Sequence, residues 1–140
     1  QPDGLVYNGA SYIGDNVYNS TGSGQTHAQS VGLGATATYQ VYLSNDGNVP
    51  QKLRVTGPAG DSEWTVRYLD YASGANLTAA VTGAGWLTPT LNPRATCRLR
   101  ILVTPGSSAS VGSTFSVLLA GRSIVDATKM DAVKATTSRR

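Results

Sequence analysis

The sequence predicts an all-β domain, a sandwich of about seven or eight antiparallel strands with an extended N-terminal arm. Two observations carry this prediction. Short runs of alternating apolar and polar residues recur along the chain, and no segment keeps a 3.6-residue period over the length of a helix. The 140 residues suffice for one domain that buries roughly two-thirds of its unfolded surface. We therefore expect one sandwich at residues 25–140, preceded by an arm at residues 1–24.

The clearest strand pattern lies at residues 35–48. Every second residue is apolar, so one face of an extended chain can be buried while the other carries Thr, Gln and Ser. The residues predicted to face the core are Ala37, Tyr39, Val41 and Leu43. Residues 45–48, Asn-Asp-Gly-Asn, tolerate the positive φ angles of a tight turn. The segment therefore predicts a half-buried strand that ends in a chain reversal.

Seven further segments repeat this alternation at the spacing expected of a sandwich. They are residues 25–31, 51–57, 64–70, 76–81, 95–104, 114–121 and 129–137. Trp64 begins a strand with large aromatic side chains and is predicted to anchor the core. Cys97 lies on the apolar face of its strand, so we interpret it as a buried residue and not as a nucleophile. The polar tail at residues 138–140 is expected to fray.

Residues 1–24 do not fit this pattern. Their apolar residues come in short groups separated by Asn, Gly and Asp, and a flexible Ser-Thr-Gly-Ser-Gly link ends the segment. One interpretation is an ordinary first strand on the chain's own sandwich. The other is an arm that docks on a neighbouring copy, because the strands from residue 25 onward are numerous enough to form a core. The residues that would make this contact are Leu5, Val6, Tyr7, Tyr12, Ile13, Val17 and Tyr18.

The composition favours an exported protein. Only 14% of the residues are charged, and Gly, Ser and Thr are abundant. The net charge of +3 is small and the arginines are scattered, so we expect no nucleic-acid binding. No apolar run reaches the ~18 residues of a membrane span. The chain begins with Gln1 and not Met, which fits a processed, secreted form or a segment cut from a longer chain.

The chain offers few groups for catalysis. It has one Glu and seven Asp, several of them in predicted turns, and its single histidine, His27, is interpreted as a polar surface residue. Asp15 or Asp70 would be the centre of an oxygen-rich calcium site, but no loop matches a calcium-binding motif. We therefore predict no enzyme activity, no catalytic residue, no metal and no cofactor.

Two features are candidates for contact with a ligand or partner. Trp86 lies among Gly, Pro and Thr, and we interpret it either as a lid over the core or as a platform that stacks on sugars. Four arginines on polar strand faces are predicted to form a basic stripe. The stripe would either pair with residues on adjacent strands or bind an acidic polysaccharide or another copy. The four are Arg54, Arg67, Arg98 and Arg100.

Several stretches together resemble a known group of modules. They are YQVYLSNDGN, LRVTGPAG, WTVRY, LTPTLNPRATCRLRILVTPG and DAVKATT, and the opening PDGLVYNGASYIGDNVYN is similar to the start of such units. These are the immunoglobulin-like (fibronectin III-like) β-sandwich modules found, often in tandem, in exported bacterial and archaeal cell-surface proteins and beside carbohydrate-active enzymes. The resemblance implies an immunoglobulin-like sandwich that acts as a spacer, an adhesive unit or a structural repeat. Fold alone does not identify a site.

These observations lead to two hypotheses. The first is a secreted structural protein, a subunit of an extracellular, pilus-like filament. Its copies would assemble head to tail by adding the arm of one as a strand to the next, so its partners are other copies of itself. The second is a non-catalytic spacer or carbohydrate-binding module of a larger cell-surface protein or enzyme, with polysaccharide as its ligand.

Overall fold

The computed structural model describes residues 1–140 as ten strands and one five-residue helix. In chain order the elements are β1 (Pro2–Tyr7), β2 (Tyr12–Ile13), β3 (Thr26–Val31), β4 (Ala37–Asn45), β5 (Leu53–Thr56), β6 (Trp64–Asp70), α1 (Thr78–Thr82), β7 (Trp86–Leu87), β8 (Thr96–Pro105), β9 (Thr114–Ser123) and β10 (Met130–Arg139). Because a helix needs about 20 residues to cross a bilayer, no helix of this chain can do so.

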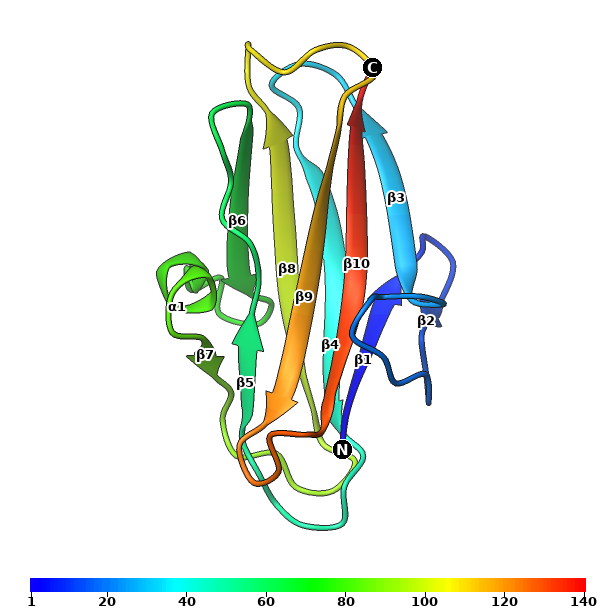
Figure 1. The fold of residues 1–140 in the computed structure, drawn as a ribbon, viewed down its shortest axis with the longest axis vertical. Coiled ribbons are helices and arrows are strands. Elements are labelled where there is room, and N and C mark those ends of the chain that lie inside the picture. The colour runs from blue at the N-terminus through cyan, green and yellow to red at the C-terminus, as the bar shows by residue number, and fades with distance from the viewer.

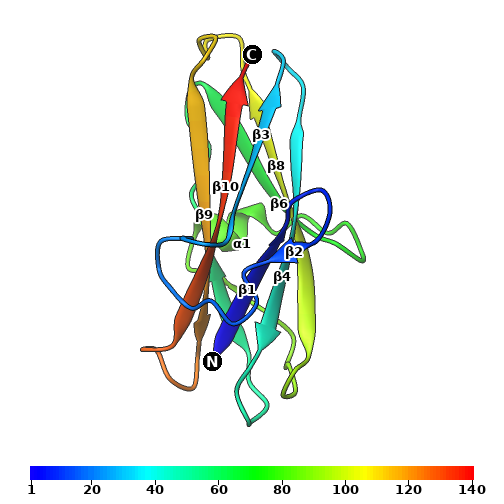
Figure 2. The same ribbon diagram turned by 90° about the vertical axis from the view of Figure 1, so that its right-hand side faces the viewer.

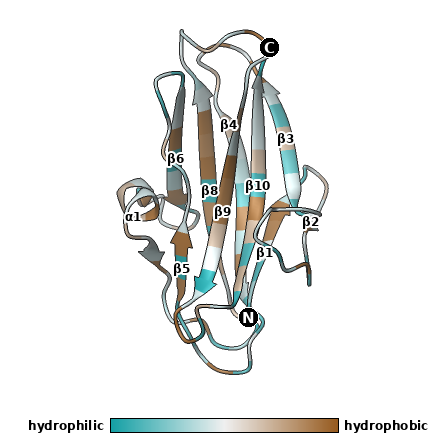
Figure 3. Cartoon of the chain, viewed as in Figure 1, coloured by the Kyte–Doolittle hydropathy of each residue, from teal (hydrophilic) through white to brown (hydrophobic).

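The strands form two five-stranded sheets packed face to face (Figure 1). Sheet A has the order β2-β1-β4-β8-β6, and sheet B has the order β3-β10-β9-β5-β7. Apolar side chains from both sheets meet between the layers, and hydrophobic residues are frequent along the middle of β8 and β9 (Figure 3). The prediction of an all-β sandwich is therefore confirmed.

The central strand of sheet A is the segment with the clearest alternation in the sequence. β4 lies between β1 and β8, and its four residues predicted to face the core are fully buried. Tyr39 is the largest of the four. Its hydroxyl donates to the Thr136 carbonyl oxygen at 2.7 Å and lies 2.8 Å from the Thr137 hydroxyl oxygen, both on β10. A buried tyrosine satisfied in this way links the two sheets without an unpaired polar atom.

Trp64 and Tyr68 of β6 fill the core at the edge of sheet A, as predicted. Trp64 stacks on Phe115 of β9 with ring centroids 5.9 Å apart. The Tyr68 hydroxyl donates to the carbonyl oxygen of Pro58 at 2.7 Å. Gly57 is required beside it, because a Cβ at that position would lie 2.5 Å from the Tyr68 hydroxyl oxygen.

Sheet B is built around β9 and β10, which form a long antiparallel pair. Their inward residues include Val117, Leu119 and Val133, all buried. β3 pairs with β10 in the parallel direction, so the prediction that all strands are antiparallel is wrong at this edge. The parallel pair is possible because the chain enters β3 from sheet A and not through a hairpin from β10.

The prediction of a strand at residues 76–81 is wrong, because most of this segment belongs to the helix α1. The alternation there consists of small residues, and alanine has the highest helix propensity. The backbone N–H of Thr78 donates to Asn76 Oδ1 at 3.0 Å, and the Thr78 hydroxyl accepts from the Tyr68 N–H at 3.0 Å. Val81 is the buried residue of the helix, so one apolar contact per turn is enough to hold it on the core.

The C-terminal tail belongs to β10 and does not fray as expected. The N–H of Arg139 donates to the Ser113 carbonyl at 2.9 Å, and its carbonyl accepts from the Gly112 N–H at 2.7 Å. The Arg140 N–H donates to the Val31 carbonyl at 3.0 Å. These bonds tie the last residues to β3 and to the loop before β9. They also place the C-terminus at the opposite end of the long axis from the N-terminus (Figure 1).

The arm lies on the chain's own sandwich (Figure 2). β1 pairs antiparallel with β4, from Pro2 opposite Asn45 to Val6 opposite Val41. Val6 is fully buried and belongs to the core. The core of the sandwich therefore includes one residue of the arm. After β2 the chain crosses from sheet A to begin β3 in sheet B.

Candidate functional site

The outer face of sheet A carries a continuous row of aromatic and arginine side chains, which we call the aromatic–arginine band. Strand alternation turns these side chains away from the core. The row runs across β2, β1, β4 and β8 to the turn that follows β6. Its members are Tyr7, Tyr12, Tyr42, Arg98, Tyr71 and Arg100.

Strand register builds the tyrosine half of the band. Tyr7 and Tyr12 are partners in the β1–β2 pair, and their ring centroids lie 5.2 Å apart. The Tyr12 ring lies 4.2 Å from that of Tyr42 on β4, and the Tyr12 hydroxyl donates to Gln40 Oε1 at 3.1 Å. Burial raises the pKa of Tyr12 above its usual value, against the opposing effect of the Arg98 charge. The hydroxyl therefore stays protonated and keeps its donor role.

Arginine side chains continue the band across β8. Arg98 lies opposite Tyr42, and its guanidinium carbon is 4.4 Å from the Tyr42 ring centroid and 4.9 Å from that of Tyr71. It also donates to the Tyr42 hydroxyl. Arg100 lies 5.4 Å from the Tyr71 ring, and its Nε has no acceptor. Cation–π contacts of this kind contribute about 0.5–1 kcal/mol each at exposed sites, so the two guanidinium groups are held in place before any ligand arrives.

A pocket of about 290 Å³ opens beside the band, at β1, β4 and β8. Tyr42 belongs to both the band and the pocket. The other lining residues are Asp3, Leu5, Asp15, Ser44 and Thr96. All lining side chains except that of Leu5 end in oxygen atoms. The pocket can therefore accept hydrogen bonds or coordinate a cation.

Asp3 is the most buried carboxylate of the pocket. It is about 1% exposed, and its Oδ2 accepts from the Asn16 backbone N–H at 3.2 Å. Burial, together with the negative charges of Asp46, Asp131 and Asp15, raises the pKa of Asp3 to about 7, although the Asn16 hydrogen bond acts in the opposite direction. No positively charged group contributes to this shift. Asp3 is thus a buried acid without a counter-charge.

Asp131 of β10 holds the arm from the side of sheet B. Its Oδ2 accepts from the Gly4 N–H at 2.7 Å, and its Oδ1 accepts from the Asn19 N–H at 2.8 Å and from Gln25 Nε2 at 2.6 Å. Burial raises the pKa of Asp131, while these hydrogen bonds act to lower it. One carboxylate therefore satisfies buried donors from both ends of the arm.

The residues predicted to contact a neighbouring copy lie in three environments in this chain. Val6 is buried, and Tyr18 is 44% exposed and donates to Asp46 Oδ2 at 2.7 Å. The half-buried ones are Leu5, Tyr7, Tyr12, Ile13 and Val17. All of them belong to the segment that rests on the chain's own sandwich, and their contact with another copy stays a prediction.

Trp86 packs on the core rather than standing free. It pairs with Val55 through β7 and lies half-buried against the core cluster. This is the position expected of a lid. A stacking role for its ring would have to use the remaining exposed edge.

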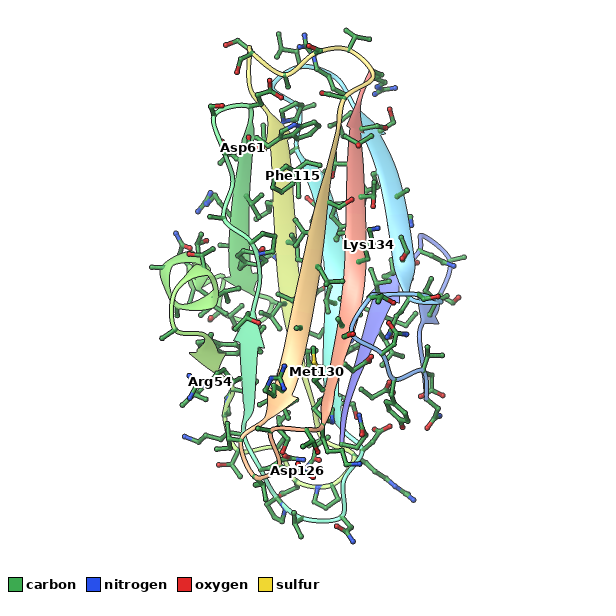
Figure 4. All side chains as sticks on the ribbon, viewed as in Figure 1. Arg54, Asp61, Phe115, Asp126, Met130 and Lys134 are labelled. Atoms are coloured by element: carbon green, nitrogen blue, oxygen red, sulfur yellow. The ribbon has the colours of Figure 1, made fainter.

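The predicted stripe of four arginines does not exist as a unit. Arg98 and Arg100 lie together in the band, and Arg67 lies on the same outer face, opposite Leu102 of β8. Arg54 lies on β5 of sheet B, near the β5–β7 edge of the molecule, and donates to the Ala84 carbonyl (Figure 4). The reason is topological, because alternation shows which face a residue occupies but not which sheet its strand joins.

The single histidine and the single cysteine of the chain both pack on the sandwich. His27 packs edge-on against Tyr39, with ring centroids 5.7 Å apart. Cys97 is half-buried, and burial raises its pKa to about 12, so the thiol stays protonated. No group of three or more His, Cys, Asp or Glu side chains is placed to hold a metal ion.

Sequence reasoning did not single out the residues at the centre of this site. Tyr42 gave a usable signal, because it is an aromatic residue on the otherwise polar face of a strand. Asp3 and Asp131 gave none, since their proximity depends on β1 and β10 meeting across the sandwich. Tyr71 follows β6 in a turn, where periodicity carries no information about neighbours.

No protein-family model and no curated protein matches this chain. Solved structures resemble it in fold. A family 123 glycoside hydrolase from Clostridium perfringens gives a TM-score of 0.52 at 8% identity, covering 82% of this chain and 23% of that chain. A variant of BcpA, the major pilin subunit of Bacillus cereus, gives a TM-score of 0.50 at 13% identity, covering 99% of this chain and 40% of that chain.

These likenesses concern the fold alone. The chain is an immunoglobulin-like β-sandwich, as its sequence resemblance implied. It spans less than half the length of either solved protein. Its place among the cell-surface repeat modules stays a prediction.

Proposed function

We propose that this domain is a non-catalytic structural unit of an extracellular assembly, in which successive units follow one another along the long axis of the sandwich. The observation that carries the proposal is the position of the two termini at opposite ends of that axis (Figure 1). Whatever precedes and follows the domain leaves it in opposite directions. A ten-residue strand such as β10 spans ~33 Å, so each added unit lengthens the assembly by about that distance.

Two further observations support this role. The chain's single histidine packs against Tyr39, and burial keeps its single cysteine protonated, so neither is arranged as a general base or a nucleophile. The sandwich shared with the Bacillus cereus pilin subunit is compatible with a unit of a fibre.

The assembly would be a secreted homopolymer in which the arm of one subunit occupies the β1 position of the next. Without β1 and its short edge partner β2, the backbone of β4 would be exposed at the edge of sheet A, and exposed edges recruit strands. The hinge would be the segment between β2 and β3, where Gly14, Gly22 and Gly24 adopt positive φ. In the exchanged form, Val6 would fill the core of the neighbouring copy in place of its own.

A pair of cysteines distinguishes the two positions of the arm. Leu5 and Tyr42 are directly opposite in the β1–β4 register, at a separation that suits a disulfide. The variant Leu5→Cys/Tyr42→Cys, made with Cys97→Ala, is assembled and then oxidised. Arm exchange predicts a ladder of disulfide-linked multimers on non-reducing gels. Monomers with a disulfide inside one chain, recovered from regular filaments, would show that the arm stays on its own sandwich. The structural-unit proposal would survive that result.

A control pair lies on the other sheet. The control variant Ser116→Cys/Thr136→Cys joins β9 to β10, which are not part of the arm. It should therefore form a disulfide within one chain, and run as a monomer, in every case. Electron microscopy of the unmodified chain checks the polymer itself. Dispersed monomers under all conditions would contradict a homopolymer of this chain.

The aromatic–arginine band favours a second function, that of a polysaccharide-binding module. Aromatic rings stack on sugar faces, and guanidinium groups donate pairs of hydrogen bonds to carboxylates. The Arg100 guanidinium lies beside the Tyr71 ring, and its terminal nitrogens are donors of this kind, whereas its Nε is itself buried. Affinity electrophoresis in gels containing acidic polysaccharides tests this function. Binding should be lost in Arg100→Gln and unaffected in Trp86→Ala, and equal mobility of the unmodified protein with and without polysaccharide would contradict it.

A further inference from the structure

The pocket beside the band contains a polar atom that the protein leaves unsatisfied. Asp3 Oδ1 has no hydrogen-bond donor, although the residue is only about 1% exposed. Asp3 is also a lining residue of the pocket. Its other carboxylate oxygen, Oδ2, accepts from the Asn16 N–H, so Oδ1 is the unpaired one. A buried carboxylate oxygen without a partner costs several kcal/mol unless a cation or donor satisfies it. This atom therefore points to a ligand.

The surrounding charges specify a positive ligand. Asp15 lines the same pocket, and Asp46 accepts a hydrogen bond at 2.9 Å from the hydroxyl of Ser44, another lining residue. These carboxylates repel one another, and no arginine or lysine lines the pocket. A cation would remove the repulsion and compensate the buried charge together.

The available ligand atoms specify the kind of cation. The lining offers carboxylate and hydroxyl oxygens and no sulfur or imidazole, which excludes the usual donor sets of zinc and copper. The pocket has room for an ion and several waters at about 30 Å³ each. An open, partly hydrated oxygen site suits calcium, which accepts six to eight ligands in flexible geometry, better than magnesium, which requires a near-ideal octahedron.

We propose that Asp3 and Asp15 bind one calcium ion in this pocket, with Ser44, Thr96 and water completing the coordination. The site departs from the sequence-based prediction of no metal. Because only two carboxylates ligate the ion directly, the affinity should fall in the weak range of extracellular modules, about 10⁻⁴–10⁻³ M. The ion would join β1 and the turn after β2 to β4 and β8, and so fix the arm on the sandwich it occupies. The inference does not depend on the proposed filament.

Calorimetry and terbium luminescence test the site in the full chain after treatment with a chelator. Calcium titrated to ~5 mM should bind at one site and raise the melting temperature by about 4–8 °C at ten times the dissociation constant. Terbium, which replaces calcium, should luminesce when tyrosine is excited, because Tyr42 lines the pocket. Excess calcium should quench this signal. An unmodified chain that shows neither heat nor a melting shift would overturn the proposal.

Substitutions locate the ion. Asp3→Asn and Asp15→Asn should lose the calcium response and the terbium signal, whereas Asp126→Asn, in the exposed β9–β10 loop, should keep both. In chelator, Asp3→Asn should melt at the same or a higher temperature than the unmodified chain, since it removes the buried charge. This measurement separates loss of the site from failure to fold. Calcium binding that persists in Asp3→Asn would also contradict the proposal.

Discussion

The two outer faces of the sandwich differ, although the strands behind them build one common core. Sheet A exposes the aromatic–arginine band and a pocket with carboxylates. The outward side chains of sheet B are of mixed kind, such as Ser116 and Thr136, whose oxygens lie 3.1 Å apart, and the exposed Leu118. Alternation requires only that the inward residues be apolar, so the outward half of each strand is free to differ. The two faces therefore differ in side-chain chemistry although they share one core.

The largest expected effect concerns the carboxylate that joins the two sheets. Asp131→Ala should lower the free energy of unfolding by roughly 3–5 kcal/mol, because it leaves the buried Gly4 N–H and the partly buried Asn19 N–H unpaired. Urea denaturation measures this loss. Hydrogen exchange of the same two amides should accelerate more than exchange in β9.

A matched control tests whether the loss of stability is specific to Asp131. Asp126→Ala removes a carboxylate from the exposed β9–β10 loop, where it accepts hydrogen bonds from Thr128 alone (Figure 4). Its effect should be much smaller than that of Asp131→Ala, because the carboxylate is exposed to solvent. Similar losses in the two variants would mean that Asp131 does not attach the arm.

The next effect compares the two faces directly. Tyr42→Ala removes the centre of the band, and it should cost about 2–3 kcal/mol through lost aromatic and cation–π contacts. Leu118→Ala, an exposed apolar residue on sheet B, should cost less than about 0.5 kcal/mol. Thermal and chemical denaturation of both variants provide the comparison. Equal costs would mean that the band is no more organised than the face of sheet B.

A smaller effect tests whether the arginine contacts are coupled to the rings. Arg98→Gln should cost about 1 kcal/mol, and the double-mutant cycle with Tyr71→Ala should give a coupling energy of about 0.5–1 kcal/mol. Arg122→Gln on sheet B serves as the control. Arg122 bonds only to the Ala127 carbonyl and the Met130 sulfur, so its loss should be within about 0.5 kcal/mol. Additive effects of Arg98→Gln and Tyr71→Ala would argue against a cation–π contact.

Much of the fold could be predicted because the core obeys a local rule. β4, β6 and β8 lie where period-two alternation placed them, with Tyr39, Tyr68 and Ile101 fully buried. The prediction failed at α1, where alternating small residues do not distinguish a strand from a helical turn. It left two interpretations of the arm open, since the burial of Val6 depends on the pairing of β1 with β4.

The candidate site was less predictable for the same reason. Arg98 and Arg100 could be placed on one strand face from their spacing, and this was correct. Their contacts with Tyr42 and Tyr71 depend on strand order, which no local pattern encodes. The pairing of Asp131 with Gly4 spans 127 positions in the sequence, so only the complete topology brings them together.

The smallest expected effect extends the comparison from the outer faces to the interior. Cys97 lies opposite Leu43 in sheet A and faces inward, and burial raises its pKa to about 12. At pH 8 the native thiol is therefore protonated. A thiol reagent should label Cys97 far more slowly in the native protein than in the same protein in denaturant. A cysteine placed on the outer face of sheet B, Ser116→Cys in a Cys97→Ala chain, should react at the rate of a free thiol without unfolding. Equal labelling rates for Cys97 and the introduced cysteine, both in native protein, would show that the inner face of sheet A is open to solvent at β8. The inner and outer faces would then not differ in solvent access at this strand.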